Sequence, residues 1–267
     1  MNIGIIGHGV VGFAVASGLK ELGHNISVYD IKYDGSSINN VSHAEICFIC
    51  VPTPPAENSG ECDSSIVRKV VSELNDIDYR GLIAIKSTII PGTTENLKRE
   101  YPNLNISFVP EFLRERCAFG DFTDNHDICI IGTDDKETYD KIRESHGYYP
   151  QKFVQVSPTE AEMTKYFNNV YNSTLIIFAN SFYEICKDMK INYTKIKNAV
   201  VNRTHIVDKY LDCNDNLRGF GGVCLPKDLK AMAALCKRRN LNIDFFETLL
   251  EENDKYKTTV YDGMREE

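Results

Sequence analysis

The first thirty residues of this chain constrain its fold more than any other stretch. Residues 2–6 are apolar and strand-like, and they lead into a glycine-rich turn at residues 7–12. An amphipathic helix follows, and then a second apolar strand, residues 26–29, which ends in Asp30. A strand, a glycine turn, a helix and a strand, with an acidic residue about 20 positions after the glycines, are typical of a dinucleotide-binding unit.

Each part of this unit has a separate task in such a site. The three glycines would allow a tight turn, close approach of the backbone to a pyrophosphate, and close packing of helix on strand. The helix N-terminus favours the phosphate charge. Asp30 would accept hydrogen bonds from a ribose diol and repel a 2′-phosphate, which favours NAD over NADP. The predicted cofactor-binding residues are Gly7, Gly9, Val10, Val11, Gly12 and Asp30.

The next 120 or so residues repeat the alternation of strand and helix. Apolar strand-like runs occur at 45–51, 82–86, 106–109, 128–131 and near 153, with helix-like stretches at 64–74 and 136–145. The run at 45–51 is apolar throughout, as expected when helices cover both faces of a parallel sheet. We therefore predict an α/β class, with a doubly wound, Rossmann-like parallel sheet in residues 1–156.

Cys47 and Cys50 form a C-x-x-C pair, which invites a redox or metal-binding interpretation. Residues three apart on a strand point to opposite faces, so the two sulfurs cannot meet. We reject that interpretation and predict no metal site.

After residue 156 the periodicity becomes helical. Ser157, Pro158 and Glu160 fit a capping box, and the helix can continue to about residue 190, roughly 45–50 Å. A helix of that length joins domains or supports a dimer. Lys165 and Asn169 share one of its faces, and without other context a solvated polar face is the simpler explanation for them. With further helices at 193–202, 226–239 and 244–257, we predict that residues 157–267 form an all-helical second domain.

Residues 219–228 hold a single thiol, Cys224, in a glycine-rich loop followed by a proline, a lysine and a carboxylate. Because Pro226 suits the first turn of a helix, Cys224 would lie just ahead of a helix N-terminus. The backbone amides there, with Lys227 nearby, would favour the nucleophilic thiolate. A buried structural cysteine is the alternative.

Composition narrows the classes of function. The chain of 267 residues has a formal net charge of −8, which argues against a nucleic-acid or acidic-membrane binder. Nine cysteines, no visible leader and no apolar run near the roughly 20 residues that span a bilayer predict a soluble cytoplasmic protein with reduced thiols.

Six motifs in order carry a resemblance. They are GHGVVG (7–12), CVPTP (50–54), KSTIIPGTT (86–94), PEFLRE (110–115), the Lys165/Asn169 helix and GFGGVCLPKD (219–228). Together they resemble the UDP-glucose dehydrogenase family, within the wider UDP-glucose/GDP-mannose dehydrogenase group. The resemblance implies NAD-dependent, four-electron oxidation of UDP-glucose to UDP-glucuronate through a cysteine thiohemiacetal and thioester.

The resemblance also implies residue roles. The implied catalytic residues are Cys224, Lys165, Asn169, Asp228, Glu111 and Thr88. Thr53, Thr88 and Glu115 would bind the cofactor. The implied substrate-binding residues are Glu111, Phe112, Leu113, Lys165, Asn169, Arg203 and Gly221, with Arg203 reaching the site of the partner subunit. Like its relatives, the chain would form a homodimer through the long helix.

The chain also departs from the family pattern. Most members carry a third domain that binds the uridine diphosphate, and we expect this domain to be absent, leaving Arg114, Arg116, Arg218 and Lys227 to compensate. Three alternatives stay open: a hydroxyacid-type dehydrogenase, another nucleotide-sugar dehydrogenase, and a non-catalytic NAD-binding subunit. The thiol in GFGGVC argues against the first, which needs no nucleophilic cysteine.

Overall fold

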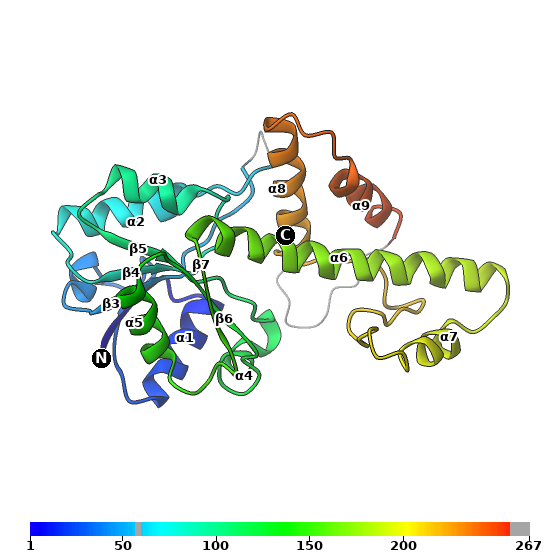
Figure 1. Cartoon of the computed structure of the whole chain (residues 1–267), viewed down its shortest axis with the longest axis horizontal. Coiled ribbons are helices and arrows are strands. Elements are labelled where there is room, and N and C mark those ends of the chain that lie inside the picture. Colours follow the sequence, from blue (N-terminus) through cyan, green and yellow to red (C-terminus); the bar gives the residue numbers. More distant parts are fainter. Residues whose placement is uncertain (57–59, 257–267) are drawn as a thin grey trace. The chain divides into compact units, whose positions relative to one another are not determined.

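The computed structural model describes residues 1–56 and 60–256 and divides them into two compact units (Figure 1). The first unit consists of Met1–Pro54 and Cys62–Lys165, and the described part of the second consists of residues 55–56, 60–61 and 166–256. The boundary between the units therefore falls within one long helix, after Lys165.

A seven-stranded sheet organises the first unit. Its strands are β1 (Asn2–Ile6), β2 (Asn25–Tyr29), β3 (Ile46–Ile49), β4 (Leu82–Ile85), β5 (Asn105–Phe108), β6 (Cys129–Gly132) and β7 (Phe153–Val156). They lie in the order β2-β1-β3-β4-β5-β6-β7, and every neighbouring pair is parallel except β5 and β6. That antiparallel contact is short, pairing Phe108 with Gly132. The predicted Rossmann-like sheet is confirmed, although the direction of β6 was not predicted.

Helices cover both faces of this sheet (Figure 1). One face packs against α2 (Ser65–Asp76) and α3 (Thr93–Glu100), and the other against α1 (Val10–Glu21), α4 (Ala118–Thr123) and α5 (Lys136–His146). Two short 3₁₀ turns, η1 (Ile38–Val41) and η2 (Glu115–Cys117), complete the unit. Neither these turns nor α4 were predicted. β3, β4 and β5 end one or two residues earlier than the apolar runs suggest, and β6 ends one residue later.

Residues of β3 alternate between the two cores, as the pleat of a strand requires. Cys47 belongs to the core beneath α2 and α3, whereas Cys50, just past β3, packs against the opposite core. Both are free thiols. Burial raises the pKa of each thiol to about 12, so neither is a reactive thiolate. The rejection of a C-x-x-C redox pair is confirmed.

The described part of the second unit is built from helices and loops. The helix α6 (Pro158–Asp188) begins at the predicted capping box: Ser157 N donates to Glu160 Oε2 at 2.8 Å, and Glu160 N donates back to Ser157 Oγ at 3.4 Å. It is followed by α7 (Tyr193–Val200), α8 (Leu225–Arg238) and α9 (Phe245–Asn253). The sequence predicted a last helix over residues 244–257, but α9 ends at Asn253, and residue 257 itself lies outside the described residues.

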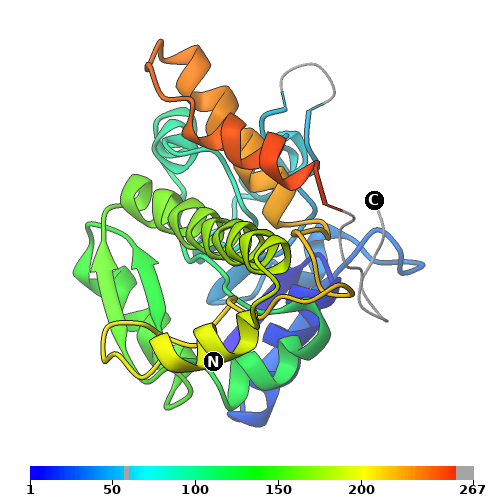
Figure 2. The same ribbon diagram turned by 90° about the vertical axis from the view of Figure 1, so that its right-hand side faces the viewer.

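The second unit has its own core, in which α8 and α9 lie side by side (Figures 1 and 2). Ile177 of α6, Leu229 of α8 and Leu249 of α9 meet there with Phe220 of the loop before α8. Within the described ranges, no helix combines the length and hydropathy needed to cross a lipid bilayer.

Candidate active site

The glycine turn has the geometry that a pyrophosphate requires. Gly7 has φ +88°, and a Cβ there would come 2.7 Å from the carbonyl oxygen of Cys50. A Cβ on Gly12 would come 1.9 Å from the carbonyl oxygen of Gly7. A Cβ on Gly9, the N-cap of α1, would meet nothing within 4 Å, and the first turn of α1 has no acidic residue. Neighbouring backbone thus excludes a side chain at Gly7 and at Gly12 but leaves space beside Gly9. This arrangement fits a phosphate at the N-terminus of α1, next to Val10 and Val11.

Asp30 follows β2 and binds this turn directly. Its Oδ2 accepts a hydrogen bond from His8 N at 2.6 Å, and its Oδ1 accepts one from Lys32 N at 2.8 Å. Partial burial alone would raise the pKa of Asp30, but these two backbone hydrogen bonds and the Lys32 charge outweigh burial and lower it. The carboxylate is therefore ionised at neutral pH, the form that accepts hydrogen bonds from a ribose diol.

A buried thiol joins the loops that carry Thr53 and Thr88. Cys62 Sγ donates to the carbonyl oxygen of Thr88 at 3.0 Å and lies 3.7 Å from the carbonyl oxygen of Thr53. Both threonines follow strands at the carboxyl edge of the sheet, where ligands of parallel sheets bind. The sequence analysis assigned no role to Cys62, because nothing in its neighbours shows which loops it contacts.

Glu111 lies just beyond β5 and is almost fully engaged by protein groups. Its Oε2 accepts from Lys86 Nζ at 3.1 Å in an ion pair whose side chains are only 9% and 1% exposed. Its Oε1 accepts from Phe112 N at 2.8 Å. Burial alone would lower the pKa of Lys86, but the charge of Glu111 outweighs burial and raises it. Lys86, which the sequence analysis treated only as the end of a strand, therefore fixes a predicted catalytic carboxylate.

Lys165 reaches the same segment from α6. Its Nζ donates to the backbone carbonyl of Glu111 and lies 5.6 Å from the centroid of the Phe112 ring. The residues around Lys165 are thus the 110–113 segment predicted for substrate binding. Phe112 packs against the core beneath α2 and α3, Leu113 packs against the opposite core, and Glu115 begins η2.

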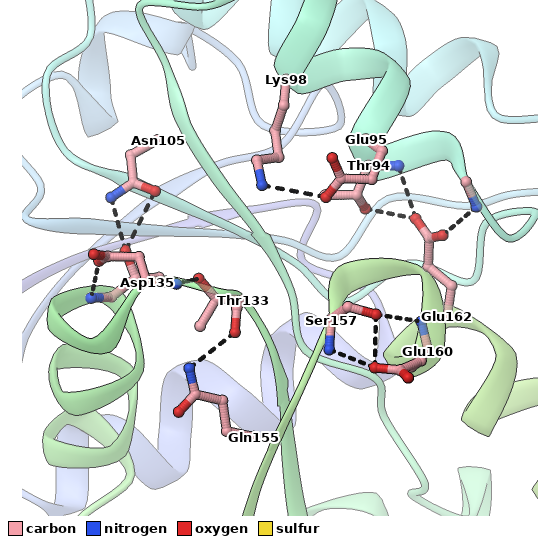
Figure 3. Close-up of polar contacts among 12 residues, drawn as sticks. Thr94, Glu95, Lys98, Asn105, Thr133, Asp135, Gln155, Ser157, Glu160 and Glu162 are labelled. Atoms are coloured by element: carbon pink, nitrogen blue, oxygen red, sulfur yellow. Dashed lines mark hydrogen bonds and ion pairs between the residues drawn. The ribbon is translucent and has the colours of Figure 1, made fainter.

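Glu162, one turn before Lys165, holds the start of α6 against α3 (Figure 3). Its Oε2 accepts from Gly92 N at 2.5 Å, and its Oε1 accepts from Thr94 N at 2.7 Å and Thr94 Oγ1 at 2.6 Å. Gly92, with φ +96°, is the N-cap of α3 and has no side chain to cap it. A carboxylate from α6 therefore caps α3 in place of a local side chain.

In the second unit, two predicted catalytic residues distant in sequence meet. Asn169 Nδ2 donates to Asp228 Oδ2 at 2.6 Å, and Asp228 is 1% exposed. Lys227 Nζ lies 2.8 Å from Asp228 Oδ1, within ion-pair distance, although this oxygen receives no well-oriented hydrogen bond from the described residues. Lys227 is itself buried and faces this carboxylate, and its effect on the Cys224 thiol stays a prediction.

Cys224 is exposed and is the N-cap of α8. Its predicted place ahead of a helix is confirmed, although the helix starts at Leu225 and Pro226 is its second residue. Two of the glycines before it need their freedom, because Gly219 has φ +57° and Gly222 has φ +74°. The alternative of a buried structural cysteine is wrong.

Other predicted residues are placed differently. Arg203 is exposed in the loop after α7. Arg114 makes a two-pronged ion pair with Asp121, and Arg218 binds Asn180 and Glu184. Lys227 is paired with Asp228, so these three cations contact acidic side chains of this protein; that they and Arg116 compensate for a third domain stays a prediction. No cluster of three His, Cys, Asp or Glu side chains suited to a metal ion occurs in the described ranges.

Comparison with known proteins identifies related dehydrogenases. The model of the NAD binding domain of the UDP-glucose/GDP-mannose dehydrogenase family matches residues 34–149, and the model of its central domain matches residues 159–255. A UDP-glucose 6-dehydrogenase of Rickettsia felis is 27% identical over 99% of this chain and 67% of its own length. A GDP-mannose 6-dehydrogenase of Pseudomonas syringae pv. tomato is 26% identical over 98% of this chain and 70% of its own.

A solved structure agrees with these relatives. The UDP-glucose dehydrogenase of Pyrobaculum islandicum superposes with a TM-score of 0.86 at 25% identity, covering 95% of this chain and 68% of that one. Fold and comparisons together define an NAD-dependent nucleotide-sugar dehydrogenase. The chain belongs to the UDP-glucose/GDP-mannose dehydrogenase family, and its cofactor is NAD.

Proposed function

We propose that this chain oxidises the C6 alcohol of UDP-glucose to the carboxylate of UDP-glucuronate, with Cys224 as the covalent nucleophile. The observation that carries the proposal is an exposed thiol at the N-terminus of α8, in the same unit as the buried Asn169–Asp228 pair. We choose UDP-glucose as the proposed substrate because the Rickettsia felis and Pyrobaculum islandicum relatives are named UDP-glucose dehydrogenases.

The chemistry needs two oxidations. NAD, when bound, accepts one hydride in each of them. After the first, the thiolate of Cys224 attacks the aldehyde carbon, and the oxygen takes up a proton to give a thiohemiacetal. Its oxidation gives a thioester, which water hydrolyses to the carboxylate and the free thiol. The bond to sulfur keeps the aldehyde on the protein between the two oxidations.

The predicted polar residues of the two units take complementary roles in this proposal. Asn169, held by Asp228, donates a hydrogen bond, and the ammonium group of Lys165 stabilises negative charge on the reacting oxygen. Asp228, whose Oδ1 has acceptor capacity left, orients the water and takes its proton during thioester hydrolysis. Glu111, bound to Lys86 through its carboxylate, positions Lys165 through its backbone carbonyl. Thr88 completes the predicted catalytic set.

The stoichiometry of the reaction tests this proposal. Purified protein with NAD and UDP-glucose should form two NADH for each sugar consumed. One NADH would indicate an ordinary alcohol dehydrogenase, and none would indicate a non-catalytic subunit. GDP-mannose is the second candidate substrate, because the Pseudomonas syringae relative is almost equally similar, and a higher kcat/KM with GDP-mannose would reassign the substrate.

Cys224→Ala tests the covalent step. It should lower turnover by at least about a thousandfold, because the thiohemiacetal cannot form. Cys117→Ala is the matched control, since Cys117 is the other exposed cysteine and should be dispensable. Full formation of UDP-glucuronate by Cys224→Ala would refute the covalent mechanism.

We also propose that Asp30 selects NAD over NADP through the ribose. Asp30→Asn keeps the size and an acceptor oxygen for His8 N but removes the charge that repels a 2′-phosphate. It should reduce the ratio of kcat/KM for NAD to that for NADP by roughly tenfold. An unchanged ratio would assign the discrimination to another group.

A homodimer through α6 is a further part of the proposal. Large apolar side chains stay exposed along this helix at spacings of three, four and seven, which places them in one stripe. Its members are Phe167, Tyr171, Phe178, Phe182 and Ile185, and Met189 follows just beyond the end of α6. A second copy offers an identical stripe, and Arg203 is exposed in a way that would allow it to reach the partner. The domain limits of 1–156 and 157–267 and the cytoplasmic location remain predictions from the sequence.

A further inference from the structure

The backbone of Phe220, four residues before Cys224, is bound on both its polar groups by one side chain. Phe220 N donates to Asn253 Oδ1 at 2.7 Å, and Asn253 Nδ2 donates to Phe220 O at 2.9 Å. A primary amide can do this because it carries an acceptor and a donor side by side. Asn253 is the last residue of α9 and is buried.

The same loop is fixed at two further points. The Phe220 ring is 2% exposed and lies in the core shared by α6, α8 and α9. On the other side, Asn180 Oδ1 of α6 accepts from Gly219 N at 3.2 Å and from Arg218 Nε at 2.8 Å. Residues 218–220 are thus held by side chains from two helices.

Little chain separates this anchored point from the thiol. Gly221, Gly222 and Val223 lie between Phe220 and Cys224, and the carbonyl of Cys224 already accepts from Asp228 N at 3.0 Å in the first turn of α8. The two glycines have no side chains that could anchor the segment. The position of the sulfur therefore depends on the anchors at the two ends, Phe220 and α8.

We propose that Asn253 is a positioning residue for Cys224. Its amide holds the loop so that the sulfur stays at the N-terminus of α8, beside the oriented backbone amides of the first helical turn. The inference rests on the proposed role of Cys224 as nucleophile. It gives α9, which contributes no residue to the proposed reaction, a role in placing the nucleophile.

Alkylation of individual cysteines tests the proposal without turnover. Asn253→Leu removes both hydrogen bonds at similar side-chain size. Because Cys224 is already exposed, its access to the reagent is not limiting. A sulfur displaced from the N-terminus of α8 should react with iodoacetamide at pH 7 about three- to tenfold more slowly. Cys117 is exposed in the other unit and is the internal control, with an unchanged rate. Peptide mass spectrometry follows both rates in the same sample.

An unchanged rate at Cys224 would overturn the proposal. Unfolding would be detected separately, because Cys47 and Cys129 are buried and react only when the first unit opens, as Cys236 does for the second. If Asn253→Leu unfolds the second unit, Asn253→Asp tests the positioning role instead. A protonated carboxyl offers the same donor and acceptor as the amide, whereas a carboxylate faces the carbonyl of Phe220 with no donor.

For Asn253→Asp, the Cys224 alkylation rate divided by that of wild type should therefore rise as pH falls from 8 to 5. A flat ratio would refute the positioning role. In turnover assays, Asn253→Leu should lower kcat more than tenfold and leave the KM for NAD within twofold. The two hypotheses fail separately: full activity of Cys224→Ala would end the covalent mechanism, while the alkylation ratio would still report on the loop.

Discussion

Lys86 and Glu111 form an ion pair that solvent hardly reaches, and Lys86 Nζ also lies 5.7 Å from the centroid of the Phe48 ring. Removing one member of such a pair leaves an uncompensated buried charge. Lys86→Met should therefore lower the free energy of unfolding by about 3–5 kcal/mol, measured by urea denaturation. The double variant Lys86→Met/Glu111→Gln, which removes both charges, should recover much of that loss.

Lys136→Met is the matched control, because it breaks the exposed pair with Asp140, whose side chains are 82% and 50% exposed. Exposed pairs are screened by solvent, so its effect should be far smaller. Equal losses in Lys86→Met and Lys136→Met would mean that the buried pair is not energetically distinct.

His146 is fully buried, and burial holds its pKa well below the ordinary value, with the Lys86 charge acting in the same direction. The folded protein therefore keeps this ring neutral, while the unfolded chain takes up a proton below about pH 6.5. The unfolded state binds more protons there, so His146 makes stability fall as pH drops below about 6.5, by up to about 1.4 kcal/mol per pH unit.

His146→Gln removes this titration and should flatten the dependence of the unfolding free energy on pH between 6.5 and 5. The exposed His205 provides the control, and His205→Gln should keep the wild-type slope. The same slope in His146→Gln would show that other groups account for the acid sensitivity.

At the scale of elements, α3 depends on a carboxylate from α6 for its first turn. Burial raises the pKa of Glu162 even though hydrogen bonds from Thr94 and Gly92 lower it. Glu162→Gln has one acceptor oxygen for the two backbone N–H groups and turns a donor toward one of them. It should lower the free energy of unfolding by about 2–3 kcal/mol, measured by urea denaturation.

Glu160→Gln serves as its control, because Glu160 makes a comparable set of hydrogen bonds with Ser157 on the exposed surface (Figure 3). Water can replace those hydrogen bonds, so the loss should be clearly smaller. Equal losses of unfolding free energy in the two variants would mean that the buried cap on α3 stabilises the protein no more than the exposed hydrogen bonds of Glu160.

At the scale of the whole molecule, the exposed stripe of α6 predicts the oligomeric state. The rings of Phe178 and Phe182 lie 4.7 Å apart between centroids, at the middle of the stripe. Phe178→Glu/Phe182→Glu would place two carboxylates in the proposed interface and should convert a dimer into a monomer in analytical ultracentrifugation.

Tyr148→Glu is the control, because Tyr148 is 81% exposed but belongs to the first unit and is not part of the stripe on α6. It should leave the dimer intact. A wild-type protein that sediments as a monomer at micromolar concentration would contradict the proposal directly.

The sequence predicts those features that depend on neighbours along the chain. The glycine turn before α1, the capping box of α6 and the place of Cys224 before α8 are of this kind, because local backbone geometry determines each of them. The cofactor turn and the cysteine loop were recognised for that reason.

Features that depend on packing were not predictable in the same way. Asn253 binds Phe220 33 residues away, and Glu162 binds Thr94 68 residues away. No local pattern marks such partners. Lys227 shows that even a residue next to the cysteine loop can have a partner that the sequence does not reveal. Its ammonium group lies against Asp228, because the direction of α8 and the packing of the core determine where the side chain points.

The hydrogen bond between Asp30 and His8 N has a practical consequence for engineering cofactor use. The carboxylate proposed to read the ribose also ties down the loop proposed to hold the phosphates, so one residue serves two subsites. Replacing Asp30 alone with a residue that cannot accept from His8 N would weaken the binding of NAD and NADP together. A successful redesign would have to supply a new acceptor for His8 N along with the cation that binds the added phosphate.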